Sequence, residues 1–146
     1  MKIGIVGAEA AKFTEAGKEK AIAAIEALLH PGVIVVSGHC HLGGIDIWAE
    51  DLAADYGLET EIYPPAALVW STGFKPRNLQ IARACDLCVC IGVDKLPSDF
   101  KGMTFKGCYH CARGGCPTPH VKSGGCWTVL QAGKLGKQMK WIIVEN

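Results

Sequence analysis

Short apolar runs alternate with segments of helical periodicity along almost the whole chain. The clearest run is VIVVS at 33–37, whose β-branched residues do not alternate with polar ones, as is typical of a strand buried on both faces of a parallel sheet. Four similar runs predict strands at 2–7, 59–63, 86–92 and 139–145. Helical segments are expected at 15–30, 45–56, 77–84 and 127–137. This order predicts an α/β fold, a three-layer sandwich in which right-handed crossovers join five parallel strands.

The length of the chain, 146 residues, suits one domain spanning 1–146. Fifteen basic and fourteen acidic residues leave a net charge of +1, which excludes a strong overall field that would attract nucleic acid or an anionic membrane. No apolar run approaches the roughly eighteen residues that a membrane span needs, and the N-terminal residues lack the pattern of a secretory signal. We therefore expect a cytoplasmic protein without a membrane partner, in which any anion site is local.

Glycine-containing turns fall where an open parallel sheet binds its ligands, at the carboxyl ends of the strands. Gly7 ends the first strand, the turn 38–46 follows the strand at 33–37, and the turn 123–128 opens the last helix. Glycine lets backbone N–H groups approach an anion closely, and a helix N-terminus adds roughly half a positive charge. Tight turns also need glycine for their own geometry, so each turn has a purely structural interpretation as well.

Polar side chains near these turns complete a candidate ligand site. Arg77 can bind a phosphate or carboxylate bidentately, and Asn78 can either cap the third helix or reach the ligand. His39 and His41 can face the ligand or lie exposed, and a second metal site there is the weaker alternative. Trp70 and Trp127 are candidates for stacking on a base. The predicted ligand-binding residues are Gly7, Gly38, His39, His41, Gly43, Gly44, Arg77, Asn78, Ser123, Gly124, Gly125 and Thr128.

The chain resembles the SLOG superfamily of Rossmann-like nucleotide-binding domains in three segments, which are SGHCHLGGIDIWAEDLA, KPRNLQIARACDLCVCI and SGGCWTVLQAGKLGKQMKWIIVE. This superfamily includes the DprA/Smf, Lonely Guy (LOG) and YspA-like proteins. The resemblance covers nearly the whole chain except a cysteine-rich insertion. It implies a nucleotide or nucleotide-derived ligand at 38–46 and 123–128, with Arg77 and Asn78 near the phosphate, and it suggests a homodimer.

Two departures from the family patterns bear on function. Leu42 stands where DprA-like proteins carry a basic residue, which weakens the alternative of single-stranded DNA binding. Gln131 stands where LOG-type phosphoribohydrolases carry a catalytic glutamate, and an amide cannot act as a general base. We therefore expect a binding or sensing module. The alternative is an N-glycosidic hydrolase or transferase acting on nucleoside monophosphates, with a catalytic carboxylate from Glu9, Asp46 or Glu50, each of which also has a simple solvated or helix-capping interpretation.

The insertion at 93–122 is rich in glycine, cysteine, proline and histidine. Its spacing, Cys108-x2-Cys111-x4-Cys116-x3-His120, is compact enough for tetrahedral zinc, and four closed ligands favour a structural metal. The open alternatives are His110 or Cys126 as the fourth ligand in place of His120, or no metal at all. The remaining cysteines do not suggest a disulfide scaffold, and Cys88 and Cys90 are expected to be small core residues on one face of a strand.

Overall fold

The computed structural model describes residues 1–112 and 118–146. The larger elements follow the predicted order from strand to helix. They are β1 (Lys2–Gly7), α1 (Glu15–Glu26), β2 (Ile34–Ser37), α2 (Ile45–Asp55), β3 (Glu59–Ile62), α3 (Lys75–Ala84), β4 (Leu87–Val93), α4 (Gly124–Lys134) and β5 (Gln138–Val144). A short 3₁₀ helix at Ala10–Lys12 follows β1, and a π-helix at Trp70–Phe74 leads directly into α3.

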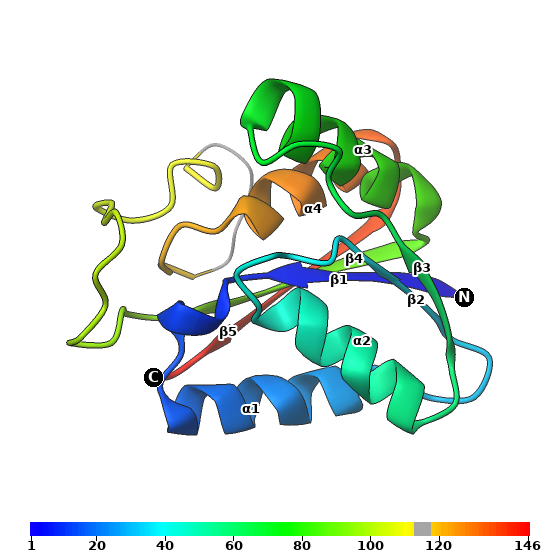
Figure 1. Ribbon diagram of the computed structural model, residues 1–146, viewed down its shortest axis with the longest axis horizontal. Helices are drawn as coiled ribbons and strands as arrows, with labels where there is room; N and C mark the ends of the chain where they lie inside the picture. Colours follow the sequence, from blue (N-terminus) through cyan, green and yellow to red (C-terminus); the bar gives the residue numbers. More distant parts are fainter. Residues whose placement is uncertain (113–117) are drawn as a thin grey trace.

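In the described part of the chain, five strands form one sheet in the order β3-β2-β1-β4-β5, and every neighbouring pair is parallel. Helices α1 and α2 cover one face of this sheet, and α3 and α4 cover the other (Figure 1). The predicted three-layer α/β sandwich is therefore confirmed. None of the helices in residues 1–112 and 118–146 is both long enough and apolar enough to cross a bilayer.

Successive residues of the central strands divide between two cores. Ile5 and Val35 face α1 and α2, whereas Val6 and Val36 face α3 and α4. The alternation follows from the period of two along a strand, and both faces are apolar because both are covered. Cys88 and Cys90 are buried in the second core, together with Cys85, which confirms the prediction that the strand cysteines pack as small apolar residues.

Two helix starts differ from the predicted ones for identifiable reasons. Helix α4 begins at Gly124, three residues before the predicted start, because Ser123 caps it: the Ser123 Oγ accepts a hydrogen bond from the Gly125 N–H at 3.1 Å. Helix α3 begins at Lys75 because the preceding residues are already helical. The segment between β3 and α3 thus ends in a π-helix, a rare conformation that is frequent at functional sites.

The strand order places a topological switch point between β1 and β4. From β1 the chain winds toward β2 and β3 on one side, and toward β4 and β5 on the other. Beyond β4 the chain makes a long excursion away from the sheet before it returns to start α4 (Figure 1). Open α/β sheets bind ligands at the carboxyl ends of the strands at this point.

Candidate functional site: a cleft beside a cysteine-histidine cluster

A cleft of about 700 Å³ opens at the carboxyl ends of β1 and β4. Its walls come from the loop after β1, the loop before α2, the π-helix with the start of α3, the insertion, and the first turn of α4. Most predicted site residues lie in these walls. Those that line the cleft are Gly7, Glu9, His41, Asp46, Arg77, Asn78, Ser123, Gly124, Gly125 and Thr128.

The first turn of α4 lies directly against the end of β1. A Cβ added to Gly125 would lie 2.8 Å from the Gly7 nitrogen and 3.0 Å from the Cys90 Sγ, so only glycine permits this approach. A Cβ added to Gly124, by contrast, would meet no described atom within 4 Å. The N-terminus of α4, with its partial positive charge, therefore faces the cleft across open space.

Arg77 is buried in the cleft wall with 8% of its surface exposed. Its Nε donates a hydrogen bond to the Asn78 Oδ1 at 2.7 Å, and its Nη1 donates to the Gly38 carbonyl. The same Nη1 lies 3.9 Å from the Asp46 Oδ2. Asn78 therefore orients the guanidinium and does not cap α3, whose start carries no side-chain cap.

Asp46 is the buried carboxylate of the cleft, with 6% of its surface exposed on the first turn of α2. Burial raises the pKa of Asp46 to about 6, against the opposing effect of the Arg77 guanidinium. Glu9, the second predicted catalytic carboxylate, also lines the cleft. The cleft thus contains one carboxyl group whose proton exchanges near neutral pH, a property of general acids and bases.

Glu50, the third predicted catalytic carboxylate, lies outside the cleft among the described residues. Its Oε1 accepts a hydrogen bond from the Ser37 Oγ at 2.8 Å, and its Oε2 lies 2.7 Å from the His39 Nδ1. His39 is likewise outside the cleft, so these two predicted site residues bind each other instead of lining the cavity. His41, two residues later, does line the cleft, and its ring stacks on Phe74 with centroids 6.0 Å apart.

The glycines of the loop before α2 pack against the protein itself. Gly43 and Gly44 have φ angles of +72° and +87°, which favour glycine. A Cβ on Gly44 would lie 2.6 Å from the Ala10 nitrogen, and the Ile45 N–H donates to the Ala8 carbonyl at 3.2 Å. Gly43 and Gly44 therefore hold the loops after β1 and β2 together, whereas Gly38 packs against the Arg77 side chain. All three glycines lie outside the described lining of the cleft.

Sequence reasoning missed two lysines of the cleft. The Lys12 Nζ donates a hydrogen bond to the Lys122 carbonyl at 3.0 Å, and both residues line the cavity. Burial lowers the pKa of Lys12. Lys122 could have been noticed because it directly precedes the glycine turn of α4, whereas Lys12 comes from a short 3₁₀ helix that has no periodic signal. These lysines add positive charge beside the N-terminus of α4.

Aromatic rings make up much of the remaining wall. Trp70 of the π-helix and Trp127 of α4 pack edge to face with centroids 4.9 Å apart, and both line the cleft. Tyr109 and His110 reach it from the insertion, with their rings 4.3 Å apart. A cleft that combines flat apolar rings with a few convergent polar groups is typical of sites for small organic ligands.

Next to this wall lies a cluster of four side chains whose potential metal-ligand atoms all lie within 4.8 Å of one another. The cluster consists of Cys108, Cys111, His120 and Cys126. The His120 Nδ1 lies 2.8 Å from the Thr118 carbonyl, which can only accept, so Nδ1 carries the proton. This leaves the Nε2 lone pair facing the cluster, 3.1 Å from the Cys126 Sγ. A histidine held in this way by a backbone carbonyl is the usual arrangement for a metal ligand.

The cluster unites His120 with Cys126, which the sequence offered as alternatives. Cys116, another predicted ligand, lies outside the described residues. His110, the third alternative, belongs to the cleft wall. A hydrogen bond from the Cys126 thiol lowers the pKa of Cys108, and the same bond raises the pKa of Cys126. Comparisons of the chain with family models, curated proteins and solved structures return no match.

Proposed function

We propose that this protein binds a nucleotide or nucleotide-derived small molecule in the cleft, as a binding or sensing module. The observation that carries the proposal is the convergence of a helix N-terminus, two lysines and several aromatic rings on one cavity at the switch point of the sheet. Phosphate groups and planar bases are the two chemical parts of a nucleotide, and the cavity offers a partner for each.

The phosphate would bind at the first turn of α4. Ser123 and Gly124 face the cleft there, and Lys12 and Lys122 bring ammonium groups to the same wall. The buried Arg77 already has three partners, the amide of Asn78, the carbonyl of Gly38 and the carboxylate of Asp46, so its charge is largely offset. We therefore assign the phosphate to the lysines and α4, with Arg77 orienting Asp46 within the cleft.

The base would pack against aromatic rings. Trp70 and Trp127 form one such surface, and the stacked pair of His41 and Phe74 forms another. Stacking on aromatic side chains contributes about 1–3 kcal/mol per base and discriminates weakly among bases. Two of these four rings, those of His41 and Trp127, belong to the segments that resemble SLOG domains, and this supports a nucleotide ligand.

Asp46 favours a second candidate function, hydrolysis or transfer at an N-glycosidic bond. A buried carboxyl group with its pKa raised to about 6 can donate and accept a proton near neutral pH. Gln131, at the position of the LOG glutamate, lies outside the described lining of the cleft. Any such chemistry would therefore use Asp46, assisted by Glu9, rather than the family's usual position.

The Cys108, Cys111, His120 and Cys126 cluster would hold structural zinc. Three thiolates and one imidazole are a donor set that tetrahedral zinc takes in closed sites, whereas magnesium and calcium prefer oxygen ligands. The burial of His120 and Cys126 keeps solvent away from two of the four positions. With four protein ligands there is no open position, so zinc would stabilise the fold and take no direct part in chemistry.

Calorimetric titration of the zinc-loaded protein tests ligand binding, with the four ribonucleoside monophosphates, their nucleosides and inorganic phosphate as probes. Lys12→Met should weaken monophosphate binding roughly tenfold to a hundredfold, as expected for loss of a charged hydrogen bond worth about 1.5–3 kcal/mol, and should leave nucleoside binding unchanged. Lys134→Met, at the other end of α4, is the matched control.

Chromatography of the same mixtures tests the second candidate function. Release of free base that stops in Asp46→Asn would support the hydrolase. Saturable binding without release would favour the binding module, and failure of every probe to bind would overturn both.

A further inference from the structure

The cysteine-histidine cluster and the cleft are built from the same short stretches of chain. Every residue of the cluster lies within two positions of a residue that lines the cleft. Tyr109 and His110 lie between Cys108 and Cys111, Lys122 follows His120 by two residues, and Gly125 and Trp127 flank Cys126. A change in the positions of the four cluster residues would therefore move the cleft wall directly.

From this interleaving we infer that a metal bound by Cys108, Cys111, His120 and Cys126 assembles one wall of the cleft, so that metal binding and ligand binding are energetically coupled. The inference rests on the proposed ligand-binding function and concerns its regulation. The metal would cross-link two parts of the chain that differ in how firmly the rest of the fold holds them.

Cys126 and His120 belong to the firmly held part. Cys126 is fully buried on the first turn of α4, and its Sγ lies 3.7 Å from the Cys90 Sγ of β4. The Val121 N–H, next to His120, donates to the Val93 carbonyl at the end of β4 at 2.9 Å. These two ligands are therefore fixed to the sheet with or without a metal.

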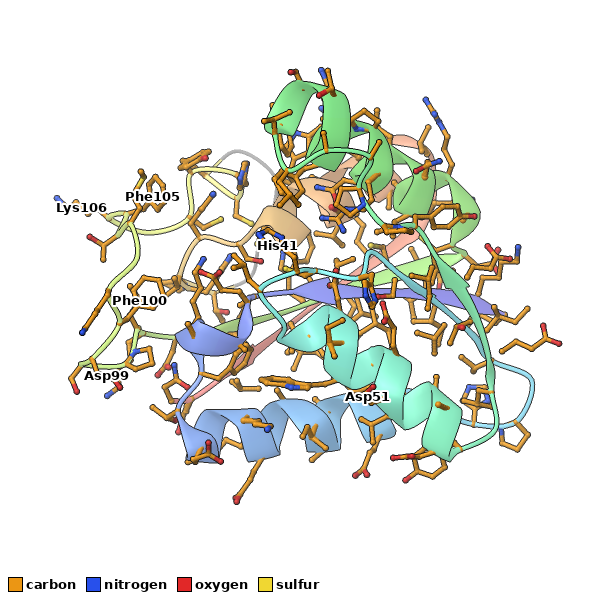
Figure 2. All side chains as sticks on the ribbon, in the orientation of Figure 1. His41, Asp51, Asp99, Phe100, Phe105 and Lys106 are labelled. Carbon is orange, nitrogen blue, oxygen red and sulfur yellow. The ribbon has the colours of Figure 1, made fainter. Side chains whose placement is uncertain are left out.

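Cys108 and Cys111 belong to a part of the insertion that has no core of its own. Between Lys101 and Ala112 no residue is buried, and only Cys108, His110 and Cys111 are even half-buried. Phe105 and Lys106 lie on the outermost part of this segment, away from the sheet (Figure 2). The Lys122 Nζ lies 5.0 Å from the Phe105 ring centroid and 5.5 Å from the Tyr109 ring centroid, which gives this segment a contact with the residues that lead into α4. Bonds from Cys108 and Cys111 to a metal would be a stronger link and would hold Tyr109 and His110 against the cleft.

Thermodynamic linkage makes this coupling reciprocal. If bound metal increases the affinity for the ligand by some factor, bound ligand must increase the affinity for the metal by the same factor. The opposite wall of the cleft includes Asp46 and Arg77, and Arg77 is held by Asn78, by the Gly38 carbonyl and by Asp46 itself, so this wall would keep its position without metal. The ligand would then bind the metal-free protein with only part of its site in place.

Titration of the zinc-loaded and the chelator-stripped protein with the ribonucleoside monophosphates tests this inference. We expect the monophosphates to bind the stripped protein at least tenfold more weakly than the zinc-loaded protein. In a competition with a chelator, the monophosphate that binds best should increase the affinity of the protein for zinc by the same factor. Equal nucleotide affinity in both forms would overturn the coupling and leave the proposed function intact. No binding to the zinc-loaded form would instead overturn the proposed function.

Hydrogen exchange provides a readout that needs no ligand. Zinc removal should speed exchange at residues 106–112 and leave residues 45–55 of α2 unchanged. Unchanged exchange at 106–112 would overturn the claim that the metal holds this wall.

Substitution of one metal-binding residue separates the effect of losing the metal from the effect of damaging the cleft. Cys108→Ser should weaken both zinc and nucleotide binding, and excess zinc should restore both, because mass action refills the weakened site. Cys85→Ala, in the core but outside the cluster, should leave both affinities unchanged. Failure of excess zinc to restore nucleotide binding in a Cys108→Ser protein that has taken up zinc would count against the coupling.

Discussion

The chain contains two glycine turns that open helices, and the structure uses them differently. In the turn before α4, Gly124 faces open space in the cleft and Gly125 packs on β1. In the turn before α2, Gly43 and Gly44 adopt positive φ angles and pack on the loop after β1, outside the cleft. A glycine pair thus indicates that something approaches the backbone closely, and tertiary structure decides whether that is a ligand or another loop.

The two turns also differ in what holds them. The turn before α2 is fixed by backbone contacts, since the Ile45 N–H donates to the Ala8 carbonyl. The turn before α4 is capped by Ser123 and carries Cys126, a member of the metal cluster. A metal would therefore be bonded to the second turn and not to the first.

Removal of zinc is expected to have the largest effect. Structural zinc sites bind with on the order of 10 kcal/mol at neutral pH, and a ligand at a thousandfold excess over its Kd stabilises the folded state by about 4 kcal/mol. We therefore expect chelation to lower the free energy of unfolding by at least about 4 kcal/mol in urea titrations. Chelation that left stability unchanged would contradict a structural metal, and hydrogen-exchange protection lost at Gly43–Gly44 rather than at residues 106–112 would contradict a metal effect confined to the side of the cleft that carries Cys126.

Substitution of one glycine in each turn tests the contrast sterically. Gly44→Ala should cost on the order of 4 kcal/mol, because it combines a strained positive φ with contact against the Ala8 and Ala10 backbone. Gly124→Ala should change stability by less than about 1 kcal/mol, since its Cβ would point into open space on a helical residue. Thermal and urea unfolding of the two variants measure this, and similar losses in both would show that the turns are packed alike.

The fold and the location of the site were predictable because they depend on patterns that local sequence carries. Periodicity predicted the strands and helices, and the rule that open parallel sheets bind ligands at the carboxyl ends of their strands pointed to loops that line the cleft. The side chains that face the crevice were less predictable. Lys12 enters from a 3₁₀ helix without periodicity, and Glu50 turns away because His39, in a left-handed conformation with φ of +50°, meets it outside the cleft.

Asp46 offers a smaller effect that depends on pH. Its pKa is raised from 3.8 to about 6 in the folded protein, so the folded state binds this proton more tightly than the unfolded state. The resulting stabilisation is full below pH 3.8 and is lost as pH rises through about 6. We expect the stability of the wild type relative to Asp46→Asn to fall by about 3 kcal/mol from pH 3.8 to 7, at 1.36 kcal/mol per unit of pKa. A stability difference between the wild type and Asp46→Asn that stays constant with pH would show that folding does not raise the pKa of Asp46.

The smallest effect contrasts two histidines of the turn before α2. His39 pairs with Glu50 and lies outside the described lining of the cleft, so His39→Ala should leave nucleotide affinity within twofold of wild type. His41 lines the cleft and stacks on Phe74, so His41→Ala should weaken nucleotide binding several-fold while changing stability little. Calorimetry on the two variants decides between them. Equal losses of nucleotide affinity in the two variants would mean that both imidazoles contact the ligand. The turn before α2 would then take part in ligand binding as the turn before α4 does, although its glycines pack on the loop after β1.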